Sequence, residues 1–132
     1  MSFSITEYEH VGIRVTDRDE ATRFYEKLGW REVADIPAAI ANEMSNDAGV
    51  RINLIFNGVS REGRRNVLQD ESAKYPGVTH AAFVIDDLNG LMEYLKQEGI
   101  EITEGPVVFD NRRRTFFIRD PDRNVLEFNE LM

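Results

Sequence analysis

Residues 9–32, EHVGIRVTDRDEATRFYEKLGWRE, decide the fold because residues 79–102, THAAFVIDDLNGLMEYLKQEGIEI, repeat their pattern. With a shift of about 70 residues, His10 aligns with His80 and the apolar positions of the two segments coincide. Self-similarity at a fixed shift indicates one structural unit that is used more than once. The sequence therefore predicts two modules of the same architecture.

Each copy has the pattern of a strand, a polar turn, a helix and a glycine. The first helix is indicated by apolar residues at helical spacing, Ala21, Phe24, Tyr25 and Leu28. Asp17 is a suitable N-cap with Glu20 three residues later, and Gly29 suits the left-handed position after the helix. The second copy predicts a helix over about residues 88–98, which ends at Gly99.

Strand-like runs follow each helix, and turn signals separate them. The runs are REVADI (31–36) and VRINLIF (50–56) in the first half, and IEIT (100–103), RTFFIR (114–119) and NVLEF (124–128) in the second. Residues 40–44, IANEM, fit either a third strand of the first half or a helical turn. Each half is therefore predicted to run β-α-β-β-β.

The length of 132 residues is typical of one domain. The predicted organisation is a single domain over residues 1–132, with module one at about 5–57, a linker at about 58–77 and module two at about 78–130. The linker is polar and long for a compact domain, which indicates either one short helical turn or a functional loop.

Composition excludes several classes of function. The net charge of −8 disfavours nucleic acid and anionic membranes as partners. The chain has no cysteine, so it has no disulfide, thiolate ligand or cysteine nucleophile. It also has no signal pattern and no apolar run long enough to span a bilayer. We therefore expect a cytoplasmic protein without a membrane partner.

Strand alternation places four polar side chains on the face turned away from the helices. His10 and His80 occupy equivalent strands, and Asn53 takes the position in the first half that Glu127 takes in the second. A carboxylate within an apolar strand needs a partner or a metal, because burying a lone charge is costly. Two imidazoles and a carboxylate suit a divalent metal. We predict that His10, His80 and Glu127 bind Fe, Mn, Zn or Ni, with Asn53 as a fourth ligand or hydrogen-bonding neighbour.

Other readings of this face stay open. Glu127 can instead form an ion pair with an arginine such as Arg14 or Arg119. Alternation also turns Val125 and Asn129 out of the core beside Glu127.

Arginines concentrate in two stretches, as Arg61, Arg64 and Arg65 of the linker and as Arg112, Arg113 and Arg114. They are either solvated loop charge or a clamp for an anionic substrate, since a guanidinium binds carboxylate or phosphate in a bidentate way. The candidate substrate-binding residues are Arg14, Arg112, Arg114, Thr115 and Phe117.

Three segments together, EHVGIRVTDRDEATRFYEKLGW, THAAFVIDD and RDPDRNVLEF, resemble the vicinal oxygen chelate superfamily. That family contains glyoxalases, bleomycin-resistance proteins, extradiol dioxygenases and fosfomycin-resistance enzymes. The resemblance implies an α+β fold in which two paired βαβββ modules form a cupped, mostly antiparallel sheet. It also implies a metal in that sheet, with His10, His80 and Glu127 at the ligand positions. A homodimer is expected, both from the resemblance and because open sheet edges favour pairing.

The expected function is that of a divalent-metal-dependent enzyme acting on a small molecule, most simply a lyase or isomerase. The metal would stabilise an enolate or oxyanion, and Glu127 or a metal-bound water would move the proton. Two alternatives are an extradiol-type dioxygenase and a metal-free drug- or metabolite-binding protein like the bleomycin-resistance proteins. Asn53 stands where glyoxalase I-type enzymes usually have glutamate, which argues against lactoylglutathione lyase activity. The second-sphere histidine usual in extradiol dioxygenases has no counterpart, because both histidines of the chain are already assigned.

Overall fold

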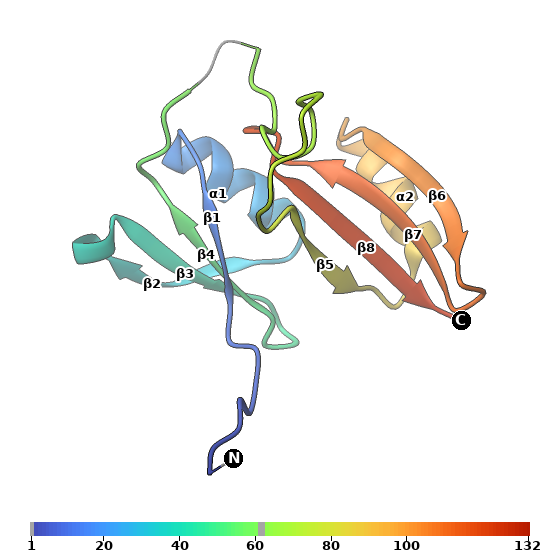
Figure 1. Ribbon diagram of the computed structural model, residues 1–132, viewed down its shortest axis with the longest axis horizontal. Helices are drawn as coiled ribbons and strands as arrows, with labels where there is room; N and C mark the ends of the chain where they lie inside the picture. Colours follow the sequence, from blue (N-terminus) through green and yellow to red (C-terminus); the bar gives the residue numbers. More distant parts are fainter. Residues whose placement is uncertain (1, 61–62) are drawn as a thin grey trace. The chain divides into compact units, whose positions relative to one another are not determined.

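The computed structural model describes residues 2–60 and 63–132, and the chain divides into two compact units, Met1–Val59 and Ser60–Met132. Arg61, part of the predicted arginine cluster of the linker, lies outside the described residues. Each unit contains one four-stranded sheet and one α-helix (Figure 1).

The first unit runs in the predicted β-α-β-β-β order. Its elements are β1 (Val11–Arg14), α1 (Arg18–Lys27), β2 (Arg31–Ile36), the 3-10 turn η1 (Pro37–Ala39), β3 (Ala41–Ser45) and β4 (Arg51–Ile55). The strands are ordered β1-β4-β3-β2; β1 pairs parallel to β4, and the other pairs are antiparallel. Of the two readings of residues 40–44, the strand is correct, and the helical turn comes just before it.

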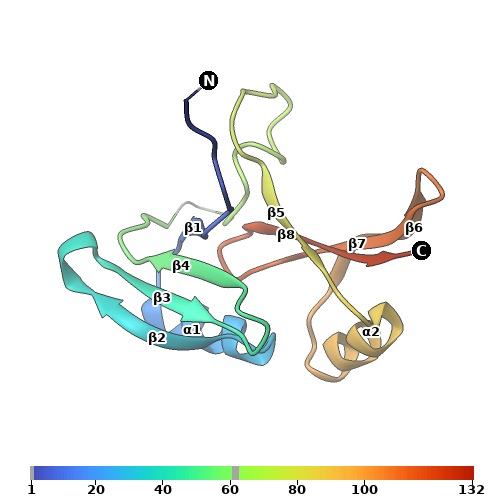
Figure 2. The same cartoon turned by 90° about the horizontal axis from the view of Figure 1, so that it is seen from below.

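The second unit repeats this arrangement. Its elements are β5 (His80–Val84), α2 (Leu88–Gln97), β6 (Ile102–Phe109), β7 (Arg113–Arg119) and β8 (Val125–Leu131). The strand order β5-β8-β7-β6, with β5 parallel to β8, is the order of the first sheet. The predicted α+β fold of two βαβββ modules is confirmed. Figure 2 shows each helix beside the sheet of its own unit.

The predicted helix ends are confirmed in both copies. The side chain of Asp17 accepts a hydrogen bond from the Glu20 backbone N–H at 2.9 Å, and Asp87 accepts one from Gly90 at the same distance. Each cap satisfies a backbone donor that the first helical turn leaves unpaired. Gly29, with φ +100°, follows the first helix, and its left-handed backbone turns the chain back toward the sheet.

Each unit buries its helix against one face of its sheet. The buried side chains of the first unit include Ile13, Val15, Ala21, Tyr25, Ile52 and Leu54, and those of the second include Leu88, Leu95, Phe116, Ile118, Leu126 and Phe128. Each large aliphatic side chain in these sets stabilises the fold by about 1.5–3 kcal/mol. The apolar neighbours of Asn53 in β4 and of Glu127 in β8 therefore belong to the core.

Strand β8 differs from the prediction, because it is buried on both faces. Val125, Glu127 and Asn129 are 4%, 7% and 6% exposed, although they alternate with the core residues Leu126 and Phe128. β8 lies between β5 and β7, so neighbours on both sides contribute cover to these side chains. Alternation gives the direction of a side chain and not what lies over it.

One side-chain network ties the start of α1 to the first sheet. Arg18 Nη2 donates to Glu32 Oε1 at 2.8 Å, and the same oxygen accepts from Asn42 Nδ2 at 2.9 Å. Asn42 is fully buried, and its Oδ1 accepts the backbone N–H of Leu54 at 3.0 Å. A side chain of β3 thus satisfies a main-chain donor of β4.

Candidate metal-binding site

His80 and Glu127 are brought together by adjacent strands of the second sheet. The register of β5 and β8 pairs Ala82 with Glu127. His80 lies two residues before Ala82 in β5, so its side chain is on the same face of the sheet as that of Glu127. His80 Nε2 and Glu127 Oε1 are 3.1 Å apart, and the side chains are 28% and 9% exposed. The imidazole is therefore the more accessible member of the pair.

Both side chains are held by further hydrogen bonds. The other ring nitrogen of His80, Nδ1, lies 2.8 Å from the hydroxyl of Thr79. The other oxygen of Glu127, Oε2, accepts from Asn129 Nδ2 at 2.8 Å. Asn129 Oδ1 in turn accepts from the buried Thr115 hydroxyl at 2.5 Å. The result is a continuous chain of five side chains that crosses three strands.

Phe117 and Thr115, which were predicted to line the site, lie on this face. Phe117 pairs with Glu127 across β7 and β8, and its ring meets the His80 ring edge to face at 5.6 Å between centroids. Thr115 pairs with Asn129 one step further along. The sequence analysis placed Asn129 on this face but gave it no role. The feature that could have indicated one is its position two residues after Glu127, where its side-chain amide can reach the carboxylate.

His10 and Asn53 belong to the first unit. His10 directly precedes β1, and its Nδ1 lies 3.0 Å from Glu9 Oε1. Asn53 pairs with Gly12 of β1, and its Oδ1 is buried with no hydrogen-bond partner among the described residues. Within either unit, the described side chains form no group of three His, Asp or Glu able to hold a metal.

The three arginines predicted to bind substrate have different surroundings. Arg14 Nε donates to Asn57 Oδ1 at 2.9 Å, and the exposed Arg112 lies 3.7 Å from Asp110. Arg114 donates to Asn89 of α2 at 3.0 Å, which places it on the helix side of the sheet. Arg114 therefore points to the opposite face from the His80–Glu127 pair.

Arg119 is not the ion-pair partner of Glu127. Its Nη1 lies 2.7 Å from Asp70 Oδ2, and the Arg119 side chain is 8% exposed. The hydrogen bond from Arg119 holds the pKa of Asp70 below its usual value, against the opposing effect of burial. Asp70 belongs to the predicted linker, where its backbone N–H also bonds to Asn66 O at 2.8 Å in a single turn. The linker is thus fastened to β7.

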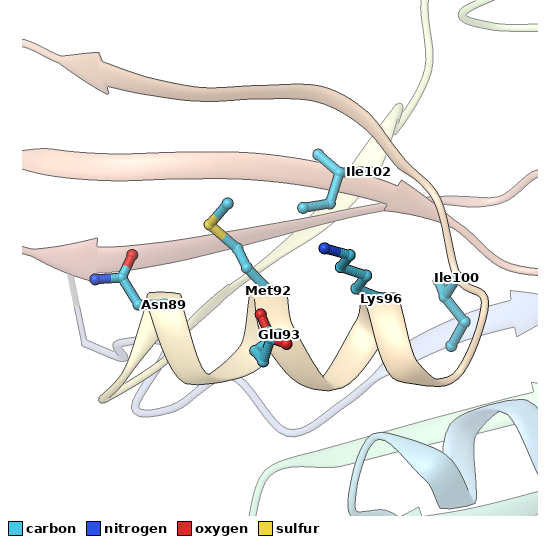
Figure 3. A pocket seen from close by; sticks show the side chains of 6 residues that line it. All are labelled: Asn89, Met92, Glu93, Lys96, Ile100 and Ile102. Carbon is cyan, nitrogen blue, oxygen red and sulfur yellow. The ribbon is translucent and has the colours of Figure 1, made fainter.

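A separate open groove lies along α2. It has a volume of ≈ 580 Å³ and is lined by Asn89, Met92, Glu93, Lys96, Ile100 and Ile102 (Figure 3). Ile102 pairs with Ile118, a core residue on the helix side of the sheet. The groove is therefore on the opposite face of the sheet from His80 and Glu127 and contains none of the predicted site residues.

Two four-stranded sheets of identical strand order, each with one helix, define a fold of the glyoxalase and dioxygenase type. The sequence profile of the Glyoxalase/Bleomycin resistance protein/Dioxygenase superfamily matches residues 7–128, and the chain belongs to this superfamily. The predicted family resemblance is thereby confirmed.

Relatives cover nearly the whole chain. A glyoxalase domain-containing protein of Mycosarcoma maydis is 30% identical over 96% of this chain and 69% of its own length. A solved structure from the mobile metagenome of V. Pseudocholerae is 28% identical with a TM-score of 0.71, and covers 98% of both chains. A virulence protein from Salmonella typhimurium is 25% identical with a TM-score of 0.70, over 98% of this chain and 100% of that protein.

Membership gives the general kind of function. The superfamily contains enzymes and non-enzymatic binding proteins, which act on or bind small molecules; its members commonly use a divalent metal and often dimerise. In the part of the chain that the structure describes, no helix is both long and apolar enough to cross a membrane.

Proposed function

We propose that this protein is a divalent-metal-dependent enzyme acting on a small molecule, with His80 and Glu127 as metal ligands. The observation that supports it best is the approach of His80 Nε2 to Glu127 Oε1 at 3.1 Å. An imidazole nitrogen and a carboxylate oxygen are donors that Zn, Fe, Mn and Ni accept.

The separation of the two donors fits a shared cation. Imidazole nitrogens and carboxylate oxygens bind Zn at about 2.0–2.2 Å, so two donors that share one cation lie no more than about 4.4 Å apart. His80 Nε2 and Glu127 Oε1 lie 3.1 Å apart. Both donors therefore suit one cation without a large movement of either side chain.

His10 and Asn53 complete the proposed set. His10 is the repeat equivalent of His80 and is proposed as the third ligand. Asn53 is the repeat equivalent of Glu127, and its buried Oδ1 has no partner among the described residues. A buried carbonyl oxygen without a donor is costly, which supports a cation or a substrate donor near Asn53 as its partner.

When bound, the metal would act as a Lewis acid that polarises a substrate oxygen. Glu127, or a metal-bound water, is proposed to move the substrate proton, and Asn129 holds the Glu127 carboxylate through Oε2. Phe117 offers an apolar surface beside His80. These roles fit a lyase or isomerase reaction through an enolate or oxyanion, and an extradiol-type dioxygenase is the alternative chemistry.

A second candidate is a metal-free binding protein. His80 and Glu127 already satisfy each other's hydrogen bonds, which is also what a structural pair would do. An antibiotic-binding protein from Streptomyces sp. shares this fold, with a TM-score of 0.72 at 20% identity. On this reading the same sheet face would hold a drug or metabolite directly.

Metal content separates the two candidates. The wild type should bind about one Zn²⁺ or Mn²⁺ per chain by mass spectrometry and calorimetry, because one metal ion per chain is proposed. His80→Ala and Glu127→Gln should lower occupancy steeply, and His10→Ala should lower it as well. Glu130→Gln is the matched control, because this carboxylate is on the same strand but accepts from Leu88 N on the helix side. Full occupancy in Glu127→Gln would contradict the metal site.

We also propose a homodimer. Each sheet ends in two edge strands, and the edge strand β6 carries three exposed apolar residues, Val107, Val108 and Phe109, at 44%, 52% and 39%. Apolar edge strands favour pairing with another chain. Light scattering at micromolar concentration should give twice the chain mass; a monomer throughout would contradict this proposal.

A further inference from the structure

We infer that Thr115 and Asn129 are positioning residues that hold Glu127 with Oε1 directed toward His80. This inference rests on the proposed function for its purpose, but its geometry stands independently of any metal. The hydrogen bonds of His80 among the described residues go to Thr79 and Glu127, so Thr115 and Asn129 would both act through the Glu127 carboxylate.

The amide of Asn129 has one satisfactory orientation. Its Nδ2 donates to Glu127 Oε2 at 2.8 Å and lies 3.4 Å from the carbonyl oxygen of Phe83. Both of these partners are acceptors only. A flipped amide would place Oδ1 against two acceptors. Asn129 is only 6% exposed, so water cannot compensate for that loss. The amide nitrogen is therefore committed to Glu127.

Thr115 completes this arrangement from β7. It is fully buried, and its hydroxyl donates to Asn129 Oδ1 at 2.5 Å. The register pairs Thr115 with Asn129 and Phe117 with Glu127, so the donor lies directly across the sheet from the amide it supports. Without this hydroxyl, Asn129 Oδ1 would lose its donor in a buried environment, and the amide would lose a contact that fixes its plane.

The hydrogen bond from Asn129 fixes the orientation of the Glu127 carboxylate. With Oε2 occupied by Asn129, Glu127 presents a single oxygen, Oε1, to His80 Nε2. Partners of this kind orient metal ligands and raise the affinity of the site.

The first module shows that the fold does not require this polar pair. Its sheet has the same strand order, with Asn53 at the position of Glu127. In the register of β3 and β4, Ala41 pairs with Ile55, at the positions that Thr115 and Asn129 occupy in the second module. The same architecture is thus built with apolar residues where no carboxylate needs orientation.

The test uses the full chain and two readouts. Thr115→Val removes the hydroxyl with little change in shape, and Thr115→Ser restores it. The double variant Thr115→Ala with Asn129→Ile installs the pair of the first module. Ile118→Val, on the helix face of the same strand, is the control for a loss of core packing alone.

The first readout is Zn²⁺ affinity by calorimetry. Thr115→Val and the double variant should bind about 10–100-fold more weakly than the wild type, as partners of metal ligands usually do on removal. Thr115→Ser and Ile118→Val should bind as the wild type does. The second readout, in metal-free protein at fixed pH, is the ¹⁵N chemical shifts of the two histidine rings. Thr115→Val should shift the ring nitrogens of His80, and Ile118→Val should leave them unchanged.

Unchanged Zn²⁺ affinity together with unchanged His80 shifts in both Thr115→Val and the double variant would overturn the inference. If the wild type takes up no Zn²⁺, the proposed function fails, and the His80 shifts alone decide the positioning role. If the variants do not fold, hydrogen exchange in the wild type tests the positioning role. The side-chain amide protons of Asn129 should then exchange slowly with solvent. Exchange as fast as that of exposed asparagines would overturn the inference.

Discussion

Replacing Asp70 by Asn should loosen the linker from the second unit and lower the free energy of unfolding. Asp70 Oδ2 receives both Arg119 Nη1 at 2.7 Å and the Asn66 backbone N–H at 2.8 Å. An asparagine oxygen in the place of Oδ2 can still accept both bonds, but the charge opposite a guanidinium that is 8% exposed is lost. A hydrogen bond to a charged group contributes about 1.5–3 kcal/mol, and we expect a loss in this range at pH 7.

The loss should depend on pH in a defined direction. The folded pKa of Asp70 lies below the ordinary value of 3.8, mainly because Arg119 donates to its carboxylate. A lowered folded pKa contributes stability that is fully present above the unfolded pKa and disappears as the pH falls through the folded pKa. The difference between wild type and Asp70→Asn should therefore be constant from about pH 5 to 7 and shrink below about pH 4.

Urea denaturation of both proteins across this pH range measures the difference. The cycle with Arg119→Met, alone and combined with Asp70→Asn, isolates the pairwise contribution. The reasoning is refuted if the coupling free energy is below about 0.5 kcal/mol at pH 7, the value expected of an ordinary surface pair. It is equally refuted if the loss in Asp70→Asn is the same at pH 3 as at pH 7.

Four further substitutions should change the stability or the metal binding of the protein. Asp17→Ala and Asp87→Ala should each cost about 1 kcal/mol in urea unfolding through loss of an N-cap, and equal wild-type stability would contradict the capping role. Gly58→Ala should destabilise by about 1–3 kcal/mol, since its Cβ would lie 2.7 Å from the Val15 carbonyl oxygen, and a melting temperature equal to that of the wild type would refute the clash. Asn53→Glu should tighten Zn²⁺ binding in calorimetry because it adds a carboxylate donor; weaker binding would show that Asn53 has a role of its own.

The helices and most strands were predictable because their signals are local. Asp17 and Gly29 mark the ends of α1 within a short stretch of sequence, and the apolar spacing between them indicates the buried face. Because the two halves of the sequence repeat, an element predicted in one half supported the same element in the other. Strand β6 shows the limit, since it runs over Ile102–Phe109 although the predicted run ended at residue 103.

The main residues of the candidate site were predictable from the sequence, but the side chains that hold them in place were not. Alternation alone placed His80, Glu127 and Phe117 on one face, and the structure brings these side chains together. The contact of Asn129 with Thr115 depends on the register between β7 and β8, which no local pattern carries. The pairing of Arg119 with Asp70 was missed for a related reason, because a loop residue 49 positions away supplies the charge.

The network from Arg18 through Glu32 and Asn42 to the Leu54 amide joins solvent to the interior of the first sheet. Its outer ion pair is exposed and therefore screened by salt, whereas its inner end protects a main-chain N–H with a side-chain oxygen. Protection of that amide lasts as long as the Asn42 side chain stays in place, and Glu32 is what holds it there. Deuterium exchange at Leu54 should consequently quicken as ionic strength rises, which makes one buried amide a reporter of charge at the surface.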